Sequence, residues 1–168
     1  MIFIYTDFGG THTTSLAAAY HLNKLPTDRK LTKEEILNVE YFNKLKTEDM
    51  GKIIFHGLDE NGNPVYTIGC GASKVVVPAM KHLGEILQKH YESHEKIIFS
   101  NTSPTVPLPM TFGGLFSRRF HIDFIGVPLL VWGAKICCDN IQRLVSYTKE
   151  AGRLTNDYVV ILDNENFK

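Results

Sequence analysis

The chain has 168 residues, a length that suits one domain spanning residues 1–168. Hydrophobic residues make up 43% of it, which indicates a packed globular protein and excludes a largely disordered one. The 18 Lys and Arg residues balance the 18 Asp and Glu residues, and this zero net charge argues against binding to nucleic acid or to a membrane through overall charge. It leaves room for a local basic site.

The three cysteines, Cys70, Cys137 and Cys138, show no spacing typical of a disulfide framework or of a zinc site. We expect them to be small buried residues. No apolar run approaches the ~20 residues that cross a bilayer, and the apolar start is too short for a secretory leader. These observations predict a cytoplasmic protein.

The first half of the chain alternates between short apolar runs and helical patterns. Segment 2–5 predicts a buried strand, and the turn-rich segment 6–12 follows it. Three hydroxyl residues, 13–15, can then cap a helix that ends before Pro26. Further elements are expected as a helix with a capping box over 33–38 and two strands, 52–56 and 65–68, joined by a turn at Asn61-Gly62.

The second half continues the alternation. Apolar residues at helical spacing predict a helix from about 76 to 91, with Pro78 in its first turn. The remaining predicted elements are strands over 96–99, 129–132 and 158–162, a short helix over 111–120, and a helix from Asp139 or Asn140 to Gly152. Together they indicate an α/β fold, a three-layer sandwich with a mainly parallel sheet and one antiparallel hairpin.

In open α/β sheets, ligands bind beyond the carboxyl ends of the strands. Small and polar residues follow three of the predicted strands, in segments 6–12, 100–103 and 133–135. If those strands are parallel, the three segments share one edge of the sheet. We therefore predict the binding site at that edge, although turns are commonly polar and glycine-rich for structural reasons alone.

The first of these segments has the architecture of a phosphate cradle: a buried strand, a glycine-rich turn and a hydroxyl-rich helix start. Aligning it with the P-loop pattern GxxxxGK[ST] places His12 at the lysine and keeps only the hydroxyl of Thr13. The likeness is therefore to a degenerate P-loop. Because a histidine is only partly charged near neutral pH, further cations are needed for a phosphate ligand.

Roles follow for the residues around this turn. His12 would contact or attack a phosphoryl group, Asp7 would bind a metal or act as a base, and Arg118 or Arg119 would neutralise charge. Since adjacent helical residues point about 100° apart, one of the two arginines is expected to face the site. The expected phosphate-binding residues are Gly9, Gly10, Thr11, Thr13, Thr14 and Lys135.

The segment Tyr5–Thr14 with its Gly-Gly-Thr-His-Thr-Thr, the three alanines 17–19, and the later segments 113–119 and 126–129 resemble an uncharacterised domain-of-unknown-function family of Gram-positive, largely spore-forming bacteria. This resemblance covers nearly the whole chain and implies no established activity. It does imply that the histidine turn and the Ser-Arg-Arg segment 117–119 belong to one design. The opening segment 4–9 is also similar to the start of S-adenosylmethionine hydroxide adenosyltransferases. Those proteins are considerably longer, and the rest of this chain does not match them.

Two functions stay open on the sequence. One is a phosphate-ligand or nucleotide-binding enzyme that transfers or hydrolyses a phosphoryl group, with Mg²⁺ and a nucleotide as the conceivable cofactor pair. The other is a non-catalytic module that binds a small anion or a protein. Elsewhere, His21 is expected at the surface, His56 in the core with its polar atoms satisfied, and Trp132 as an anchor of the core.

Overall fold

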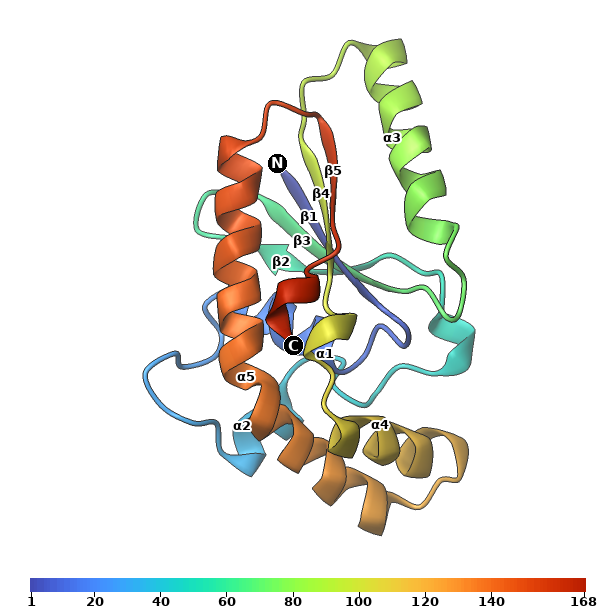
Figure 1. Ribbon diagram of the computed structural model, residues 1–168, viewed down its shortest axis with the longest axis vertical. Helices are drawn as coiled ribbons and strands as arrows, with labels where there is room; N and C mark the ends of the chain where they lie inside the picture. The colour runs from blue at the N-terminus through green and yellow to red at the C-terminus, as the bar shows by residue number, and fades with distance from the viewer.

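The computed structural model describes residues 1–168, which form a five-stranded sheet in the order β2-β3-β1-β4-β5 (Figure 1). Strand β1 is central and runs parallel to both of its neighbours, β3 and β4. Strand β5 is parallel to β4, and only β2 runs antiparallel, to β3. The strands are β1 (Ile2–Asp7), β2 (Ile54–Leu58), β3 (Pro64–Gly69), β4 (Ile97–Asn101) and β5 (Val159–Leu162).

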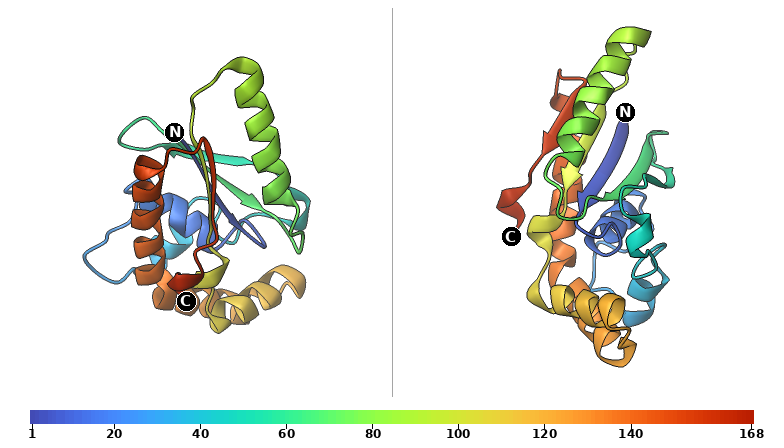
Figure 2. Two further views of the ribbon diagram at one scale, coloured as in Figure 1. Left: turned by 45° about the horizontal axis from the view of Figure 1, so that its top comes forward. Right: turned by 90° about the vertical axis from the view of Figure 1, so that its right-hand side faces the viewer.

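Helices cover both faces of this sheet. Helix α3 lies on one face, and α1, α2 and α5 lie on the other, with α4 packed against α5 (Figures 1 and 2). The α-helices are α1 (Thr13–His21), α2 (Lys33–Asn38), α3 (Val76–Tyr91), α4 (Leu108–Gly114) and α5 (Asp123–Leu154), and a π-helical turn follows α4 at Leu115–Arg119. The predicted fold class, α/β with a mainly parallel sheet and one antiparallel pair, is confirmed.

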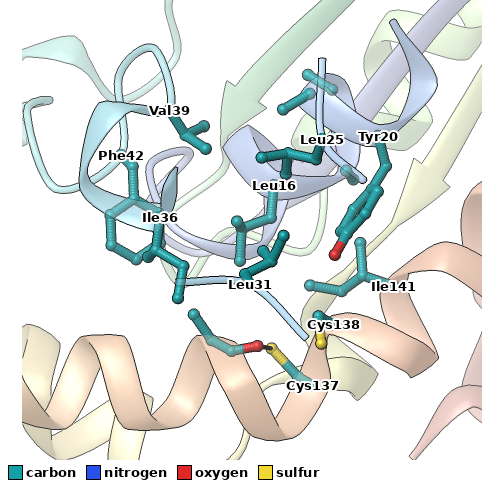
Figure 3. Packing of buried hydrophobic residues seen from close by; sticks show 14 of the residues in the cluster. Leu16, Tyr20, Leu25, Leu31, Ile36, Val39, Phe42, Cys137, Cys138 and Ile141 are labelled. Atoms are coloured by element: carbon teal, nitrogen blue, oxygen red, sulfur yellow. Dashed lines mark hydrogen bonds between the residues drawn. The ribbon is translucent and has the colours of Figure 1, made fainter. Parts of the chain in front are cut away.

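The larger part of the core lies between the sheet and the α1–α5 side. Ala17 and Ala18 are fully buried, and such small side chains let α1 approach its neighbours closely. Side chains from α1, α2 and their connecting loop pack against Cys137, Cys138 and Ile141 of α5 (Figure 3). The two cysteines are therefore small core residues, as expected.

The sequence predicted a strand over 129–132, and this prediction is wrong. The apolar segment is part of the 32-residue helix α5. Gly126 and Gly133 do not interrupt the helix but are contact points between helices. A Cβ on Gly133 would lie 2.7 Å from Cβ of Met110 on α4, and one on Gly126 would lie 2.6 Å from the amide nitrogen of Ser117. Because these glycines carry no side chain, α4 and the following turn pack directly against α5. Helix α5 continues without a break through both glycines.

This correction moves several predicted features. Gly133, Ala134 and Lys135 lie within a helix and not at the end of a strand, and Lys135 is exposed. Trp132 is 58% exposed and does not anchor the core. Asp139 and Asn140 lie inside α5 and do not cap a helix, and α5 continues two residues past Gly152 to Leu154.

Helix α5 is the one helix long and apolar enough, by length and composition, to cross a membrane. However, 44% of its most apolar 18-residue window is buried inside the protein. The core helix of a soluble protein meets the same criterion.

Candidate anion site at the end of β1

The carboxyl ends of β1 and β4 lie side by side in the centre of the sheet. The chain leaves β1 into α1 on one face, while α3 reaches β4 across the other face, so a topological switch point lies here. The amide of Thr102, just after β4, donates to the carbonyl of Thr6 at 2.8 Å. Its hydroxyl lies 2.9 Å from the hydroxyl of Thr13. Two of the three predicted segments thus meet at one edge, and the third, 133–135, does not.

The carboxylate of Asp7 occupies the inside of the β1–α1 turn. The amide of Gly10 donates to its Oδ1, and the hydroxyl of Thr13 donates to its Oδ2 at 2.9 Å. Burial raises the pKa of Asp7, while these bonds and the amides of Gly9 and Thr14 act to lower it. The anion held by the inner amides is the chain's own. The amide of Gly10 and both oxygens of Asp7 thus have partners within the protein, whereas Gly10 was expected to bind phosphate and Asp7 to bind a metal or act as a base.

The glycines of the turn are required by close packing against the end of β3. Gly10 has a φ of +70°, and a Cβ there would lie 2.6 Å from the amide nitrogen of Gly69. A Cβ on Gly69 would in turn lie 2.7 Å from the carbonyl carbon of Gly9. The amide of Cys70 donates to the carbonyl of Asp7 at 2.8 Å, which fixes the two segments together. The turn is therefore rigidly held on its inner side.

On its outer side, the amides of Thr11, His12 and Thr13 have no hydrogen-bond acceptor within the protein. Helix α1 begins at Thr13 with His12 as its N-cap residue, and no side chain caps it, although hydroxyl caps were expected. The buried hydroxyls of Thr14 and Ser15 also lack a partner. This start of α1 presents unpaired donors together with the positive end of the helix dipole.

His12 lies at this outer rim and is oriented by a chain of polar side chains. Its Nε2 is 3.2 Å from Oδ1 of Asn43, and Nδ2 of Asn43 donates to Oγ of Ser117 at 2.9 Å. The hydroxyl of Ser117 donates to the carboxylate of Asp123. Because a carboxylate accepts and a hydroxyl has one proton, the directions of the bonds are fixed along the chain. His12 must donate from Nε2, which leaves Nδ1 unprotonated in the neutral ring.

The surroundings of the ring are mostly apolar and packed closely against it. Phe42 packs edge-on at 5.4 Å between ring centroids. A Cβ on Gly114 of α4 would lie 3.3 Å from Cε1 and 3.7 Å from Nδ1, so the glycine keeps a side chain away from this edge of the imidazole. Burial lowers the pKa of His12 to about 4; the hydrogen bond with Asn43 opposes this shift, and the charge of Arg118 adds to it.

The two arginines of the Ser-Arg-Arg segment differ in their exposure. Arg118 is half-buried and close enough for its charge to depress the pKa of His12, whereas Arg119 is exposed. Burial also lowers the pKa of Arg118 itself, and the charge of Asp49 opposes that shift. The histidine turn and the Ser-Arg-Arg segment therefore meet, through Gly114, Asn43 and Arg118.

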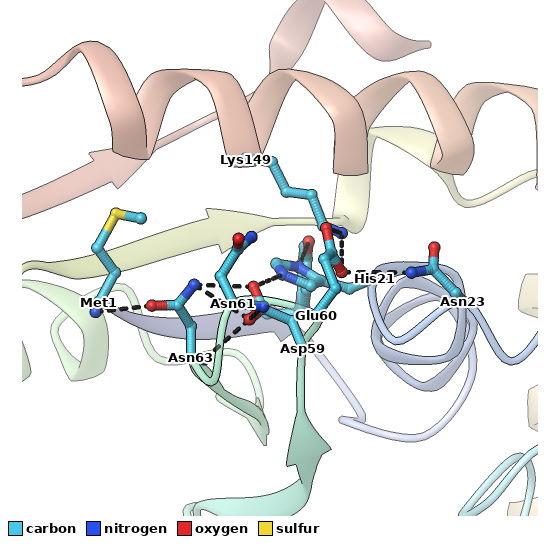
Figure 4. Close-up of polar contacts among 9 residues, drawn as sticks. Met1, His21, Asn23, Asp59, Glu60, Asn61, Asn63 and Lys149 are labelled. Carbon is cyan, nitrogen blue, oxygen red and sulfur yellow. Dashed lines mark hydrogen bonds and ion pairs between the residues drawn. The ribbon is translucent and has the colours of Figure 1, made fainter.

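His21 was expected at the surface, but it is fully buried at the end of α1. Its Nδ1 lies 2.7 Å from the hydroxyl of Tyr5, and its Nε2 lies 3.3 Å from Asp59 (Figure 4). Burial lowers the pKa of His21 to about 4, helped by the charge of Lys149. His56 is buried and hydrogen-bonded to Thr67, as expected.

No group of three or more His, Cys, Asp or Glu side chains is placed to hold a metal ion. Both oxygens of Asp7 accept bonds from the protein, and the hydroxyl of Thr13 donates to Asp7. The residues at the turn therefore do not fit Mg²⁺, and we derive no step through a metal.

A cavity of about 310 Å³ lies along another flank of α1, between α1, α2 and β2, and no residue from 7 to 14 lines it. The candidate site is thus separate from this cavity. Its residues, as the structure brings them together, are Thr11, His12, Thr13, Asn43, Gly114, Ser117 and Arg118.

A family model described as "Protein of unknown function (DUF3189)" matches residues 2–150. The chain belongs to this family. The DUF3189 match covers the β1–α1 turn, the Ser-Arg-Arg segment and most of α5, so the whole candidate site lies within the family domain. Neither the search of curated proteins nor the search of solved structures found a match.

Proposed function

We propose that this chain binds a small phosphate-bearing ligand, such as a nucleotide or another phosphoester, at the outer rim of the β1–α1 turn, and that His12 transfers or hydrolyses its phosphoryl group. The observation that carries the proposal is the directed chain from Asp123 through Ser117 and Asn43 to His12. It leaves the Nδ1 lone pair free on a neutral imidazole whose Nδ1 edge faces Gly114, and the charge of Arg118 acts on this ring. The cytoplasm is the proposed location, since all three cysteines are free.

Each group has a defined task in this scheme. The amides of Thr11, His12 and Thr13 and the start of α1 hold the phosphoryl oxygens, and Arg118 neutralises part of their charge. Nδ1 of His12 forms a bond to phosphorus while the bond to the leaving oxygen breaks, and that oxygen takes the electron pair and then a proton from solvent. The hydrogen bond from Nε2 to Asn43 stabilises the ring while it carries positive charge. Attack by water then releases phosphate and restores the imidazole.

Turnover measurements test this function. Purified wild-type protein and His12→Ala are assayed on p-nitrophenyl phosphate and on nucleoside mono-, di- and triphosphates, with His90→Ala as the control because His90 is an exposed histidine on α3. Loss of a nucleophile or base at the reacting atom lowers the rate by about 100-fold or more. We expect His90→Ala to keep the wild-type rate. Equal rates in wild type and His12→Ala on every substrate contradict catalysis.

A second function, the non-catalytic anion-binding module, is favoured by the carboxylate of Asp7 inside the turn. A catalytic P-loop holds a phosphate deep in its turn. The negative charge of Asp7 opposes the binding of such an anion at that position. If inorganic phosphate shifts the amide resonances of Thr11–Thr13 while His12→Ala does not change any turnover, the module is the correct description.

A further inference from the structure

Helix α4, the π-helical turn and the first half of α5 form one end of the molecule (Figure 1). Large apolar side chains are exposed on these elements. Phe124 is 81% exposed and Trp132 is 58% exposed. The other exposed apolar residues of this lobe, defined as residues 108–136, are Leu108, Phe112, Leu115, Phe120, Ile125 and Ile136. Apolar exposure concentrated in this way marks a surface that contacts something else.

On α5 these residues form a continuous stripe. Successive helical residues turn by about 100°, so Phe124, Pro128, Trp132 and Ile136 lie within about a third of the helix circumference. The opposite side of α5 carries Gly126, Leu130 and Gly133, which meet α4 and its following turn. The stripe thus faces away from these helix contacts, and the side chains of Phe124, Trp132 and Ile136 are about half exposed or more.

The charge of the lobe identifies its partner. Residues 108–136 contain three basic residues, Arg118, Arg119 and Lys135, and one acidic residue, Asp123, although the chain as a whole is neutral. In a pair of copies joined through this lobe, like charges would face each other, which is unfavourable. Phenylalanine and tryptophan mixed with Lys and Arg are typical of surfaces that lie at the headgroup level of an anionic bilayer.

We propose that this lobe docks the protein onto the surface of an anionic membrane, with the α5 stripe facing the headgroups. The helix lies on the membrane and does not cross it, because its other side is buried against the rest of the protein. This proposal departs from the expectation from net charge, which argued against a membrane partner on the chain average and left room for a local basic site. Arg118 of the lobe also belongs to the candidate anion site, but the docking surface itself is the exposed stripe of α5 and does not require turnover at His12.

Trp132 is the single tryptophan of the chain and lies on the stripe, so its fluorescence reports docking directly. The full-length protein is titrated with vesicles of phosphatidylcholine alone and of phosphatidylcholine mixed with phosphatidylglycerol. We expect a blue shift and a gain in intensity with the mixed vesicles only, and we expect both to decrease as salt is raised. Arg119→Gln and Lys135→Gln should each weaken the partition about fivefold.

Two apolar variants separate this surface from general stickiness. Phe124→Ser should reduce vesicle binding strongly and leave the unfolding midpoint unchanged, because its side chain is exposed. Leu83→Ser removes an equally apolar residue exposed on α3 and should bind as wild type. An unchanged Trp132 spectrum with anionic vesicles overturns the proposal. A blue shift that follows protein concentration without vesicles also overturns it, since the lobe then covers a second copy.

Discussion

The main-chain amide of Gly10 donates a hydrogen bond to the carboxylate of Asp7, which ends β1 three residues earlier. The turn therefore has an inner side closed by its own anion and an outer side, at Thr11–Thr13, whose amides are unpaired. A catalytic P-loop offers all of its amides to phosphate. In the proposed site, the outer amides, His12 and Arg118 remain for a ligand.

Replacing Gly10 by alanine should destabilise the protein strongly, because the new Cβ would lie 2.6 Å from the amide nitrogen of Gly69. We expect a loss of about 3 kcal/mol or more in the free energy of unfolding, from overlap together with the positive φ. Gly62→Ala is the matched control, because Gly62 has a φ of +77° and nothing within 4 Å. It should lose only about 1 kcal/mol. Urea denaturation measures both, and equal losses would show that the turn does not press on β3.

Thr13 and Thr14 are adjacent and fully buried, but only Thr13 has a hydrogen-bonded hydroxyl. Thr13→Val removes a donor from the buried carboxylate of Asp7 and should cost about 1–3 kcal/mol in the free energy of unfolding. Thr14→Val removes an unsatisfied polar atom and should be neutral or slightly stabilising. The two variants are compared by urea denaturation without added anions. A larger loss in Thr14→Val would contradict the assignment of the bond to Asp7.

Stability should fall as the pH drops from about 6.5 towards 4. Burial lowers the pKa of His56 from 6.5 to about 4 in the folded protein, so in this window the unfolded chain binds the proton first. The free energy of unfolding therefore decreases by at most about 1.4 kcal/mol per pH unit for this residue as the pH falls. His56→Gln should show a shallower decrease over the same window. A variant with the wild-type pH dependence would mean that His56 is protonated when folded.

The sequence predicted most of the fold because its signals were local. The capping box of Thr32 and Glu35 starts α2 as expected, with both of its hydrogen bonds formed. The failure at 129–132 has a physical cause: an apolar run next to Gly133 has the same pattern whether the glycine ends a strand or lets two helices touch. The distinction depends on Met110, which is distant in sequence and packs there only in the folded chain.

The candidate site was predictable in part. The histidine turn stood out because a strand, glycines and hydroxyls follow in order, and the Ser-Arg-Arg segment stood out as a basic pair. Asn43 was missed because nothing in the polar sequence around it indicates a site, and Asp123 was missed because a single carboxylate at a helix start has many structural roles. Asp7 was expected in the turn after the first strand but is the last residue of β1, and the contacts of its carboxylate depend on Gly10 and Thr13, which follow it in the folded chain.

The most direct test of the central claim is a ¹⁵N NMR titration of the His12 side chain with and without inorganic phosphate. We predict that near neutral pH the proton is on Nε2 and Nδ1 is bare, that the ring titrates at about pH 4, and that phosphate shifts Nδ1 together with the amides of Thr11–Thr13. A proton on Nδ1, or a ring that titrates at its ordinary value and does not respond to phosphate, would contradict the account.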